Sequence, residues 1–500
     1  MKDSGPFFLV GAVLLIIIVL YFANNPMKHG RWFLIRRFIN WFPLGMTYAF
    51  LYMGRYNLVV SKNALGSQMS IKDFSIIFAA GTWTYALSFL VNGPLVDKIG
   101  GKKGIIIGAV GSSIANIILG VLTYLVAMGQ LKMNMVVAFS AIYAVNMYFQ
   151  SYGAVSIIKV KAYWFHVRER GVFGAIFGTL ISFGVYFAFD WGGAIVRMTS
   201  LKGAGTGGWF QNLLQKIFAV QSRPVDATWA VFFVPAAILL FWALLDVFTI
   251  KDTPEEANFP HLDTRDASSG QMHVELSTKD LLIKVFASPL MLLIAVVEMT
   301  SGIFRNGVTQ WYTIFAKLPA VVEEPGAVFF SEHWGFLLCL FGIAGGFAGG
   351  LISDKFFQSR RGPPAGLLSA FVLAMACLMT AFLYSNQWGV GFAAAFVVFG
   401  AIGITSLMSG TAATDFGGRK ATATCSGIVD GFAYLGSGLQ SICIGHLVEH
   451  LSWYWWPIFL MPFAVVGGLI AIRLWHSLPA ATKKYLAEVE KRPEPVLTFD

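Results

Sequence analysis

The longest uncharged stretch of the chain, residues 362–414, constrains the fold more than any other feature. It contains no Asp, Glu, Lys or Arg, and two further runs, 104–131 and 133–158, are also free of charge. A membrane-spanning helix needs about 20 apolar residues, so the longest stretch holds two spans with a turn near Ser385. Inside a bilayer the backbone satisfies its hydrogen bonds only in helices or closed barrels, and runs of this length indicate helices.

Composition extends this interpretation to the whole chain. Only 12% of the residues are charged, against about 25% in soluble domains, and the mean hydropathy is +0.67. We therefore predict an all-α polytopic membrane protein with twelve spans and one extra N-terminal helix. The predicted spans are 38–66, 75–97, 104–127, 133–158, 171–195, 228–249, 286–316, 333–353, 362–384, 388–414, 421–447 and 452–475.

The net charge of +10 is distributed as membrane topology requires. If the loop with Lys98, Lys102 and Lys103 is cytoplasmic, alternate loops collect 25 of the 36 Lys and Arg residues, and the opposite side collects 8. This is the positive-inside rule, so the charge gives no reason to expect a nucleic-acid partner. No Asn-x-Ser/Thr acceptor occurs, which favours a bacterial inner membrane over a secretory-pathway membrane.

An apolar stretch, 7–23, precedes the twelve spans. Its positive charges, Lys28, Arg31, Arg36 and Arg37, follow the apolar core, whereas a cleaved signal peptide has them before it. The stretch is therefore predicted to be an additional helix with its N-terminus outside, and an interfacial segment is the alternative. We expect the twelve-span core to pack and to transport without residues 1–30.

Two arginines, Arg55 and Arg305, interrupt apolar segments. A guanidinium stays protonated, so it must face a cavity, a partner or a bound anion rather than lipid. Neither arginine has an acidic residue three or four positions away. The planar guanidinium binds phosphate through two parallel hydrogen bonds, which favours a phosphate site. The alternatives are that Arg55 extends to the membrane surface, and that Arg305 pairs with Glu298 two helical turns away.

A short motif recurs at corresponding places in the two halves of the chain. It closes the second and the eighth predicted spans, with Gly93, Asp97 and Lys98 in one and Gly350, Asp354 and Lys355 in the other. Glycine lets two helix ends approach closely, and an aspartate can cap or pair with a neighbouring helix. We predict that these loops are conformational switches, and ordinary solvated loops are the alternative. A third loop of this kind contains Arg168, Glu169 and Arg170.

Each half thus has one intramembrane arginine on its first span and one switch motif after its second. Two six-span halves of this kind resemble the major facilitator superfamily, in which the binding site lies between the halves near mid-membrane. The predicted organisation is an extra N-terminal membrane helix (1–30), an N-terminal six-helix half (31–250), a cytoplasmic linker (251–285), a C-terminal six-helix half (286–477) and a cytoplasmic tail (478–500).

Five segments resemble, in order, the organophosphate:phosphate antiporter family: 54–57, 149–153, 164–171, 419–427 and 431–436. The resemblance covers roughly residues 40–475 and implies a phosphate held between Arg55 and Arg305, with Gln150 near the site. The chain departs from glycerol-3-phosphate members at Tyr56, Ile181, Gln310 and Cys339, where those members have lysine, histidine, aspartate and glutamate. The departures favour a hexose phosphate or another phosphorylated metabolite over glycerol 3-phosphate.

Other polar and aromatic residues of the spans are candidates for a role at the site. Those that could line the substrate cavity are Tyr56, Gln150, Trp311, Tyr312 and Tyr434, and packing is the alternative for the aromatic ones. The acids that could act in coupling or gating are Glu298, Asp190 and Asp430, although a structural cap is favoured for Asp190. No metal site, organic cofactor or nucleophile–base set is indicated, so we do not expect an enzyme.

The predicted function is alternating-access exchange of a phosphorylated metabolite for inorganic phosphate, by a protein that acts as a monomer. Two alternatives use the same fold. One is a membrane sensor of external sugar phosphate, and the other is a proton-coupled anion symporter that uses Glu298 or Asp190. Flux into phosphate-loaded liposomes distinguishes the three.

Overall fold

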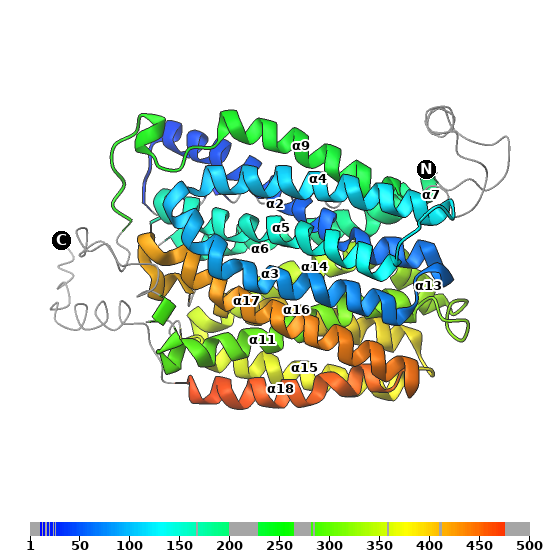
Figure 1. Cartoon of the computed structure of the whole chain (residues 1–500). Coiled ribbons are helices and arrows are strands. Elements are labelled where there is room, and N and C mark those ends of the chain that lie inside the picture. Colours follow the sequence, from blue (N-terminus) through cyan, green and yellow to red (C-terminus); the bar gives the residue numbers. More distant parts are fainter. Residues whose placement is uncertain are drawn as a thin grey trace.

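The computed structural model describes residues 27–166, 169–199, 229–264, 286–357, 360–409 and 413–475, with residues 282–283 and some positions within 11–25. In these ranges the chain forms long helices that lie side by side and has no strand (Figure 1). The all-α prediction is therefore confirmed. The predicted tail, the predicted linker beyond residue 264 apart from 282–283, and the loop at 200–228 lie outside the described residues.

The first half of the chain contains α2 (Arg31–Leu65), α3 (Ile71–Ile99), α4 (Gly101–Ala127), α5 (Met135–Trp164), α6 (Arg170–Tyr186), the π-helical η3 (Phe187–Trp191), α7 (Gly192–Thr199) and α9 (Ala230–Thr249). The second half contains α11 (Pro289–Thr309), α12 (Trp311–Phe315), α13 (Pro325–Glu332), α14 (Trp334–Phe356), α15 (Gly362–Phe382), α16 (Gln387–Leu407), α17 (Ala413–His450) and α18 (Trp455–Arg473). Short 3₁₀ turns follow α2 (η1, Gly66–Gln68) and α9 (η4, Glu255–Ala257).

Several spans begin where a polar loop residue caps the helix. Ser70 and Asp73 form a capping box at the start of α3, and Asn134, Ser288 and Asn386 accept from the third backbone N–H of α5, α11 and α16. Each cap satisfies a backbone donor that the helix itself cannot pair. The short polar loops therefore define where the apolar spans start.

Among the described residues, nine helical segments are long and apolar enough to cross a membrane. Three more helices, α2, α5 and α17, have 35, 30 and 38 residues but are more polar. Nine and three make the twelve predicted spans. These three helices carry Arg55, Gln150 and Tyr434, whereas Arg305 lies in one of the nine apolar segments, 289–315.

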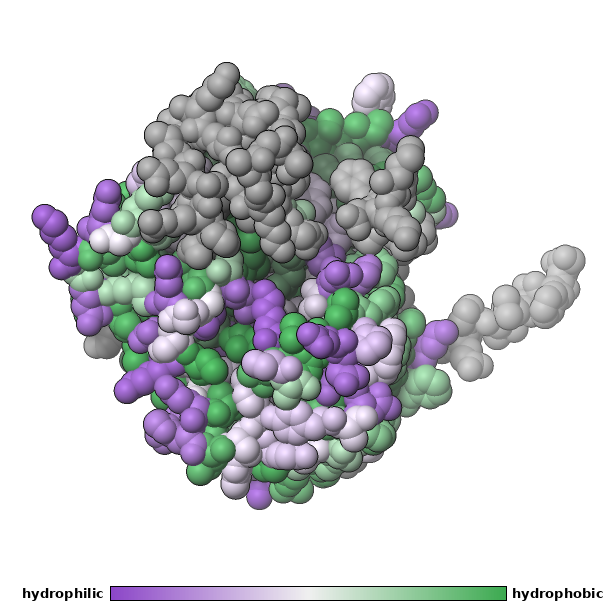
Figure 2. Space-filling view, turned by 90° about the vertical axis from the view of Figure 1, so that its right-hand side faces the viewer, coloured by the Kyte–Doolittle hydropathy of each residue, from purple (hydrophilic) through white to green (hydrophobic). Residues whose placement is uncertain are grey.

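The two halves pack against each other mainly through α3 with α17 and α6 with α14. In Figure 1, α3 and α17 run side by side where the two sets of helices meet. Figure 2 views the end at which α7 and α13 lie, and hydrophilic side chains are visible there among hydrophobic ones. This end is the external one in the predicted topology.

The segment before α2 is attached to the first half. Tyr21 is buried, its hydroxyl donates to the Leu34 carbonyl (2.9 Å), and it accepts from Arg37 Nε (3.0 Å). A side chain of the segment before residue 30 thus completes the surroundings of a buried arginine, while transport by a protein without residues 1–30 stays a prediction. Periodicity in 7–23 could not show this contact, since Tyr21 looks like any residue of an apolar helix.

Candidate functional site

Arg55 lies inside the protein on α2 and has three tyrosine rings around its guanidinium. The residue is 1% exposed, and its Cζ lies 4.6, 4.4 and 5.0 Å from the ring centroids of Tyr52, Tyr85 and Tyr434. Its Nε donates to Gln150 Oε1 (2.9 Å) and its Nη1 donates to the Tyr434 hydroxyl. This burial contradicts the alternative that Arg55 extends to the membrane surface.

Arg305 lies on α11, 6% exposed, with its Cζ 5.7 Å from the Tyr434 ring centroid. Tyr434 of α17 therefore has both guanidiniums against one ring. Arg305 Nε and Arg55 Nη2 are buried and have no hydrogen-bond partner among the described residues. No salt bridge in the described chain involves either arginine.

This arrangement suits a bound anion. A buried guanidinium normally pairs with a carboxylate, since an uncompensated charge in a low-dielectric interior is costly. Aromatic faces stabilise a cation only partly, by about 0.5–2 kcal/mol each. Two buried cations with free N–H groups can donate charge-assisted hydrogen bonds to a phosphate, and the phosphate would supply the missing negative charge.

A chain of buried polar side chains holds Gln150 in the orientation that Arg55 requires. Gln150 Nε2 donates to Asn146 Oδ1 (3.2 Å) and Ser112 Oγ (3.3 Å), so its Oε1 is directed to Arg55. Asn146 Nδ2 donates to the Gly54 carbonyl (3.0 Å), and Asn146 Oδ1 accepts from Asn116 Nδ2 (3.1 Å). Asn146, Ser112 and Asn116 were not predicted, although an asparagine inside each of two uncharged spans could have indicated them.

Tyr56 reaches the second half of the protein. Its hydroxyl donates to Asn306 Oδ1 of α11 (2.6 Å), and Asn306 Nδ2 donates to Ser437 Oγ of α17 (2.6 Å). Tyr56 therefore lies at the interface of the two halves, one residue after Arg55. Asn306 was not predicted, although it directly follows Arg305 in the sequence.

The two other predicted aromatic candidates lie in the packing of the second half. Trp311 Nε1 donates to Gln440 Oε1 (3.0 Å). The Tyr312 ring stacks on Trp334 at 4.2 Å between centroids. No hydrogen bond, ion pair or cation–π contact among the described residues links either one to Arg55 or Arg305. Both side chains therefore serve in helix packing within the second half, as the alternative interpretation proposed.

The three candidate acids occupy different environments, and of these only Glu298 is fully buried. Glu298 Oε1 accepts from Thr405 Oγ1 (2.9 Å), its Oε2 has no partner in the described chain, and it forms no salt bridge with Arg305. The alternative of a Glu298–Arg305 pair is therefore not what the structure contains. Asp430 accepts from Ser409 Oγ (2.5 Å). Asp190 accepts from the backbone N–H groups of residues 335 and 336 (2.9 and 3.0 Å), which caps α14 from the other half.

The first switch motif closes the cytoplasmic end of the interface. Asp97 forms a salt bridge with Lys159 of α5 (2.9 Å) and accepts from the Thr424 N–H (3.1 Å) and Oγ1 (2.8 Å) of α17. A methyl group at Gly93 would lie 3.1 Å from Thr424 Cα, so only glycine allows this approach without displacement. Lys98 is exposed.

The second switch motif makes no such approach. No atom of the described residues lies within 4 Å of a methyl group placed on Gly350, and Lys355 is exposed. The close helix approach predicted at Gly350 is therefore not formed. The side chain of Asp354 lies outside the described residues. The two motifs thus differ in the described chain, because Gly93 lies against the backbone of α17 in the other half, whereas the close approach near Gly350 is made by its neighbour Gly349, against Gly403 of α16 in the same half.

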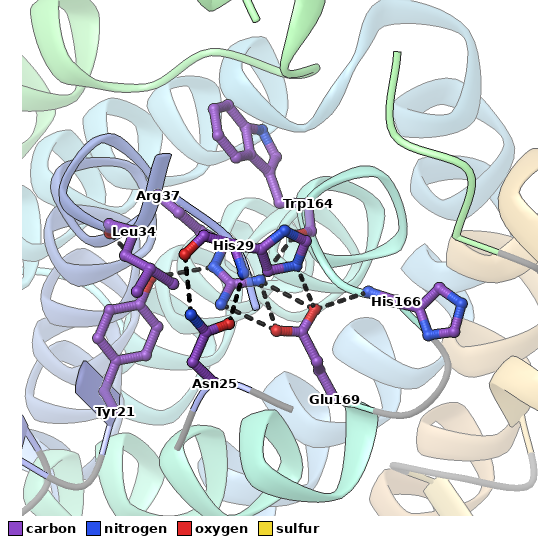
Figure 3. Close-up of polar contacts among 8 residues, drawn as sticks. All are labelled: Tyr21, Asn25, His29, Leu34, Arg37, Trp164, His166 and Glu169. Atoms are coloured by element: carbon purple, nitrogen blue, oxygen red, sulfur yellow. Dashed lines mark hydrogen bonds and ion pairs between the residues drawn. The ribbon is translucent and has the colours of Figure 1, made fainter. Parts of the chain in front are cut away.

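The third loop contains a buried ion pair at the cytoplasmic ends of α2 and α5 (Figure 3). Arg37, 2% exposed, donates to Glu169 through both Nη1 and Nη2 at 3.0 Å. His29 Nε2 lies 3.3 Å from Glu169 Oε2, which also accepts from the His166 N–H (3.1 Å). Burial alone would raise the pKa of Glu169, but the His29 hydrogen bond and the Arg37 charge hold it below its ordinary value of 4.5. Arg168 and the Arg170 side chain lie outside the described residues.

We expect Glu169→Gln to destabilise the folded protein by about 3–5 kcal/mol at neutral pH, because it leaves the buried Arg37 charge uncompensated. The pKa of Glu169 is lowered on folding, so its contribution is complete above pH 4.5 and is lost as the pH falls through the folded value. Melting temperatures of the purified protein at pH 7 and at pH 3.5 measure the effect.

The matched control is Glu255→Gln. Glu255 also pairs with a histidine, His261, but their side chains are 43% and 57% exposed, so a change under about 1 kcal/mol is expected. Equal effects of the two substitutions, or a Glu169 effect that does not depend on pH, would contradict the structural role of this ion pair.

Comparison with known proteins is consistent with this geometry. The sequence-family model described as Major Facilitator Superfamily matches residues 44–441. The chain is 24% identical to the membrane sensor protein UhpC of Escherichia coli, over 92% of this chain and 98% of that protein. It is 24% identical to the glycerol-3-phosphate transporter of Bacillus subtilis (86% and 90% covered) and 23% identical to a probable hexose phosphate transport protein of Chlamydia pneumoniae (91% and 94%). The fucose:proton symporter of Escherichia coli has a similar fold, with a TM-score of 0.55 and 17% identity over 87% of this chain and 98% of that one.

Proposed function

The chain belongs to the major facilitator superfamily, and on this basis we propose that it exchanges a phosphorylated sugar or a related metabolite for inorganic phosphate. It is a multi-pass protein of a bacterial inner membrane. Curated relatives are named for hexose phosphate transport, glycerol-3-phosphate transport and membrane sensing, which supports a transporter-type protein for organic phosphates and confirms the family resemblance.

One observation carries the proposal for the anion. Arg55 and Arg305, one from each half, are buried against the same Tyr434 ring, and neither has a carboxylate partner in the described chain. A phosphate dianion between them would neutralise both charges and fill the free donor positions of Arg55 Nη2 and Arg305 Nε.

Charge balance explains why exchange is favoured over one-way transport. In the empty carrier the two guanidiniums repel each other across the interface, so closing the halves around a desolvated site is unfavourable. A bound phosphate or phosphate ester removes the repulsion and lowers the free energy of the closed state. Contacts at both ends, Asp97 with Thr424 and Asp190 with the start of α14, are those that opening on either side would break. The carrier therefore reorients loaded in either direction and seldom empty.

A sensor is the second candidate, because UhpC is named as a membrane sensor protein and matches 92% of this chain. The same anion site would serve a sensor, with ligand binding but no turnover.

The test uses the purified full-length protein in liposomes. Vesicles loaded with inorganic phosphate should take up labelled hexose phosphate, and vesicles without internal phosphate should not. One protein per vesicle should suffice, since a monomer contains both arginines.

Three other results have distinct meanings. Binding without flux, detected as thermal stabilisation by hexose phosphate, would identify a sensor. Uptake driven by a pH gradient in vesicles without phosphate would identify a proton symporter. If the protein neither binds nor takes up any phosphate compound, the anion site itself is refuted.

A further inference from the structure

Gln310 is a buried amide whose side chain forms no hydrogen bond. The residue is 0% exposed, and both Nε2 and Oε1 are buried without a partner among the described residues. Every other buried Asn or Gln side chain in the described chain makes at least one hydrogen bond, including Gln440 and Gln387. An unpaired amide in the interior is unfavourable, so a group that binds there transiently is the natural explanation.

The position of Gln310 places it close to the anion site. It ends α11 five residues after Arg305, which corresponds to about 7.5 Å along the helix toward the external side. It also lies four residues after Asn306, so the two side chains share a face of the helix. Asn306 on that face contacts Tyr56 of the first half and Ser437 of α17. Gln310 is thus one turn beyond a contact between the halves.

We propose that Gln310 recognises the hydroxyl groups of the organic portion of the substrate while the two arginines hold its phosphate. This inference rests on the proposed phosphate site. An amide has one acceptor and two donor positions, which match a hydroxyl that both donates and accepts. Gln310 lies about 7.5 Å along α11 and about 140° around it from Arg305, so a sugar or polyol chain would reach it from the phosphate by passing the Asn306 face, where Tyr56 of the first half makes contact. A neutral amide also suits hydroxyls better than a second anionic group such as a carboxylate.

Gln310→Leu tests this assignment, because leucine has a similar size but no hydrogen-bonding group. Affinities for hexose phosphate, ethyl phosphate and inorganic phosphate are measured by thermal shift of the purified protein and by competition for phosphate exchange in liposomes. Hexose phosphate should bind about 3- to 12-fold more weakly, the loss expected for one hydrogen bond. Ethyl phosphate and inorganic phosphate, which lack the hydroxyls, should change by less than about 2-fold.

Two further variants make the result specific. Gln387→Leu removes another buried amide, whose Nε2 donates to the Leu383 carbonyl (2.8 Å) at the start of α16, and it should leave all three affinities unchanged. Gln310→Asn keeps the amide and should recover part of the hexose phosphate affinity.

Unchanged hexose phosphate affinity in Gln310→Leu would overturn the assignment, and so would an equal loss for all three ligands, which indicates a packing role. A wild-type protein that binds hexose phosphate without transporting it would refute exchange. It would not refute the role of Gln310, because the affinities of the wild type and of Gln310→Leu are both measured by binding. Failure of the wild type to bind any of the three would refute both proposals.

Discussion

Arg55→Lys and Arg305→Lys should each abolish or severely reduce exchange of inorganic phosphate and of organic phosphate alike. Lysine keeps the charge but replaces a planar, bidentate donor with a point charge. The loss of one charge-assisted contact should weaken phosphate binding by about 1.5–3 kcal/mol, or about 10- to 150-fold. Arg55→Lys should weaken phosphate binding more than Arg305→Lys does. Arg55→Lys also removes the hydrogen bonds from Nε to Gln150 and from Nη1 to the Tyr434 hydroxyl.

The measurement is phosphate affinity and exchange rate in liposomes, with membrane expression checked for each variant. Arg473→Lys is the matched control, since Arg473 is exposed at the end of α18 and should tolerate the change. Alanine at either site arginine should be at least as damaging as lysine. Phosphate binding that survives in both lysine variants at near-original affinity would refute the two-arginine site.

Gly93→Val should reduce exchange at least about tenfold by keeping the cytoplasmic end of the interface open. A Cβ at this position would lie 3.1 Å from Thr424 Cα and 3.2 Å from the Ala423 carbonyl oxygen, which are backbone atoms that cannot move aside alone. Valine would separate α3 from α17 and break the hydrogen bonds from Thr424 to Asp97. If valine raises the free energy of the conformation closed at the cytoplasmic end by a few kcal/mol, that conformation is no longer appreciably populated.

The readout is labelling of an introduced cysteine at Ser151, in a protein whose native cysteines are replaced, by a thiol reagent added from the cytoplasmic side; Ser151 is buried and accepts from Asn92 Nδ2 (2.7 Å), next to Gly93. Labelling should increase in Gly93→Val while phosphate binding persists. Gly350→Val is the matched control from the other half, because a Cβ added there meets no atom of the described residues within 4 Å, and it should retain most of the exchange. Comparable losses in the two variants would show that both motifs act equally, as the repeat alone predicts.

Sequence alone was sufficient for the fold class and for the positions of the spans. Long uncharged runs leave the backbone no alternative to helices in lipid, and the short polar loops provide the caps that begin them. The two arginines could be predicted for a related reason, since a permanent charge in an apolar run must have a specific partner. Tyr56, Gln150 and Tyr434, predicted beside them, do contact an arginine or the opposite half in the structure.

Only the tertiary structure decided which polar groups meet. The support of Gln150 by Asn146 and Ser112 joins two helices, and a single polar residue on an apolar helix does not indicate which neighbour it will face. The same holds for the hydrogen bond between Arg37 and Tyr21 and for the one between Thr424 and Asp97, whose partners lie 16 and 327 residues apart in the sequence. The repeat gave both halves the same motif, but helix packing brought Gly93 against α17, while Gly350 meets no other described residue closely. The hydropathy of each segment depends on that segment alone, whereas hydrogen bonds between helices depend on how the segments are arranged in space. The sequence by itself therefore determined the spans, and helix packing determined the contacts of the site.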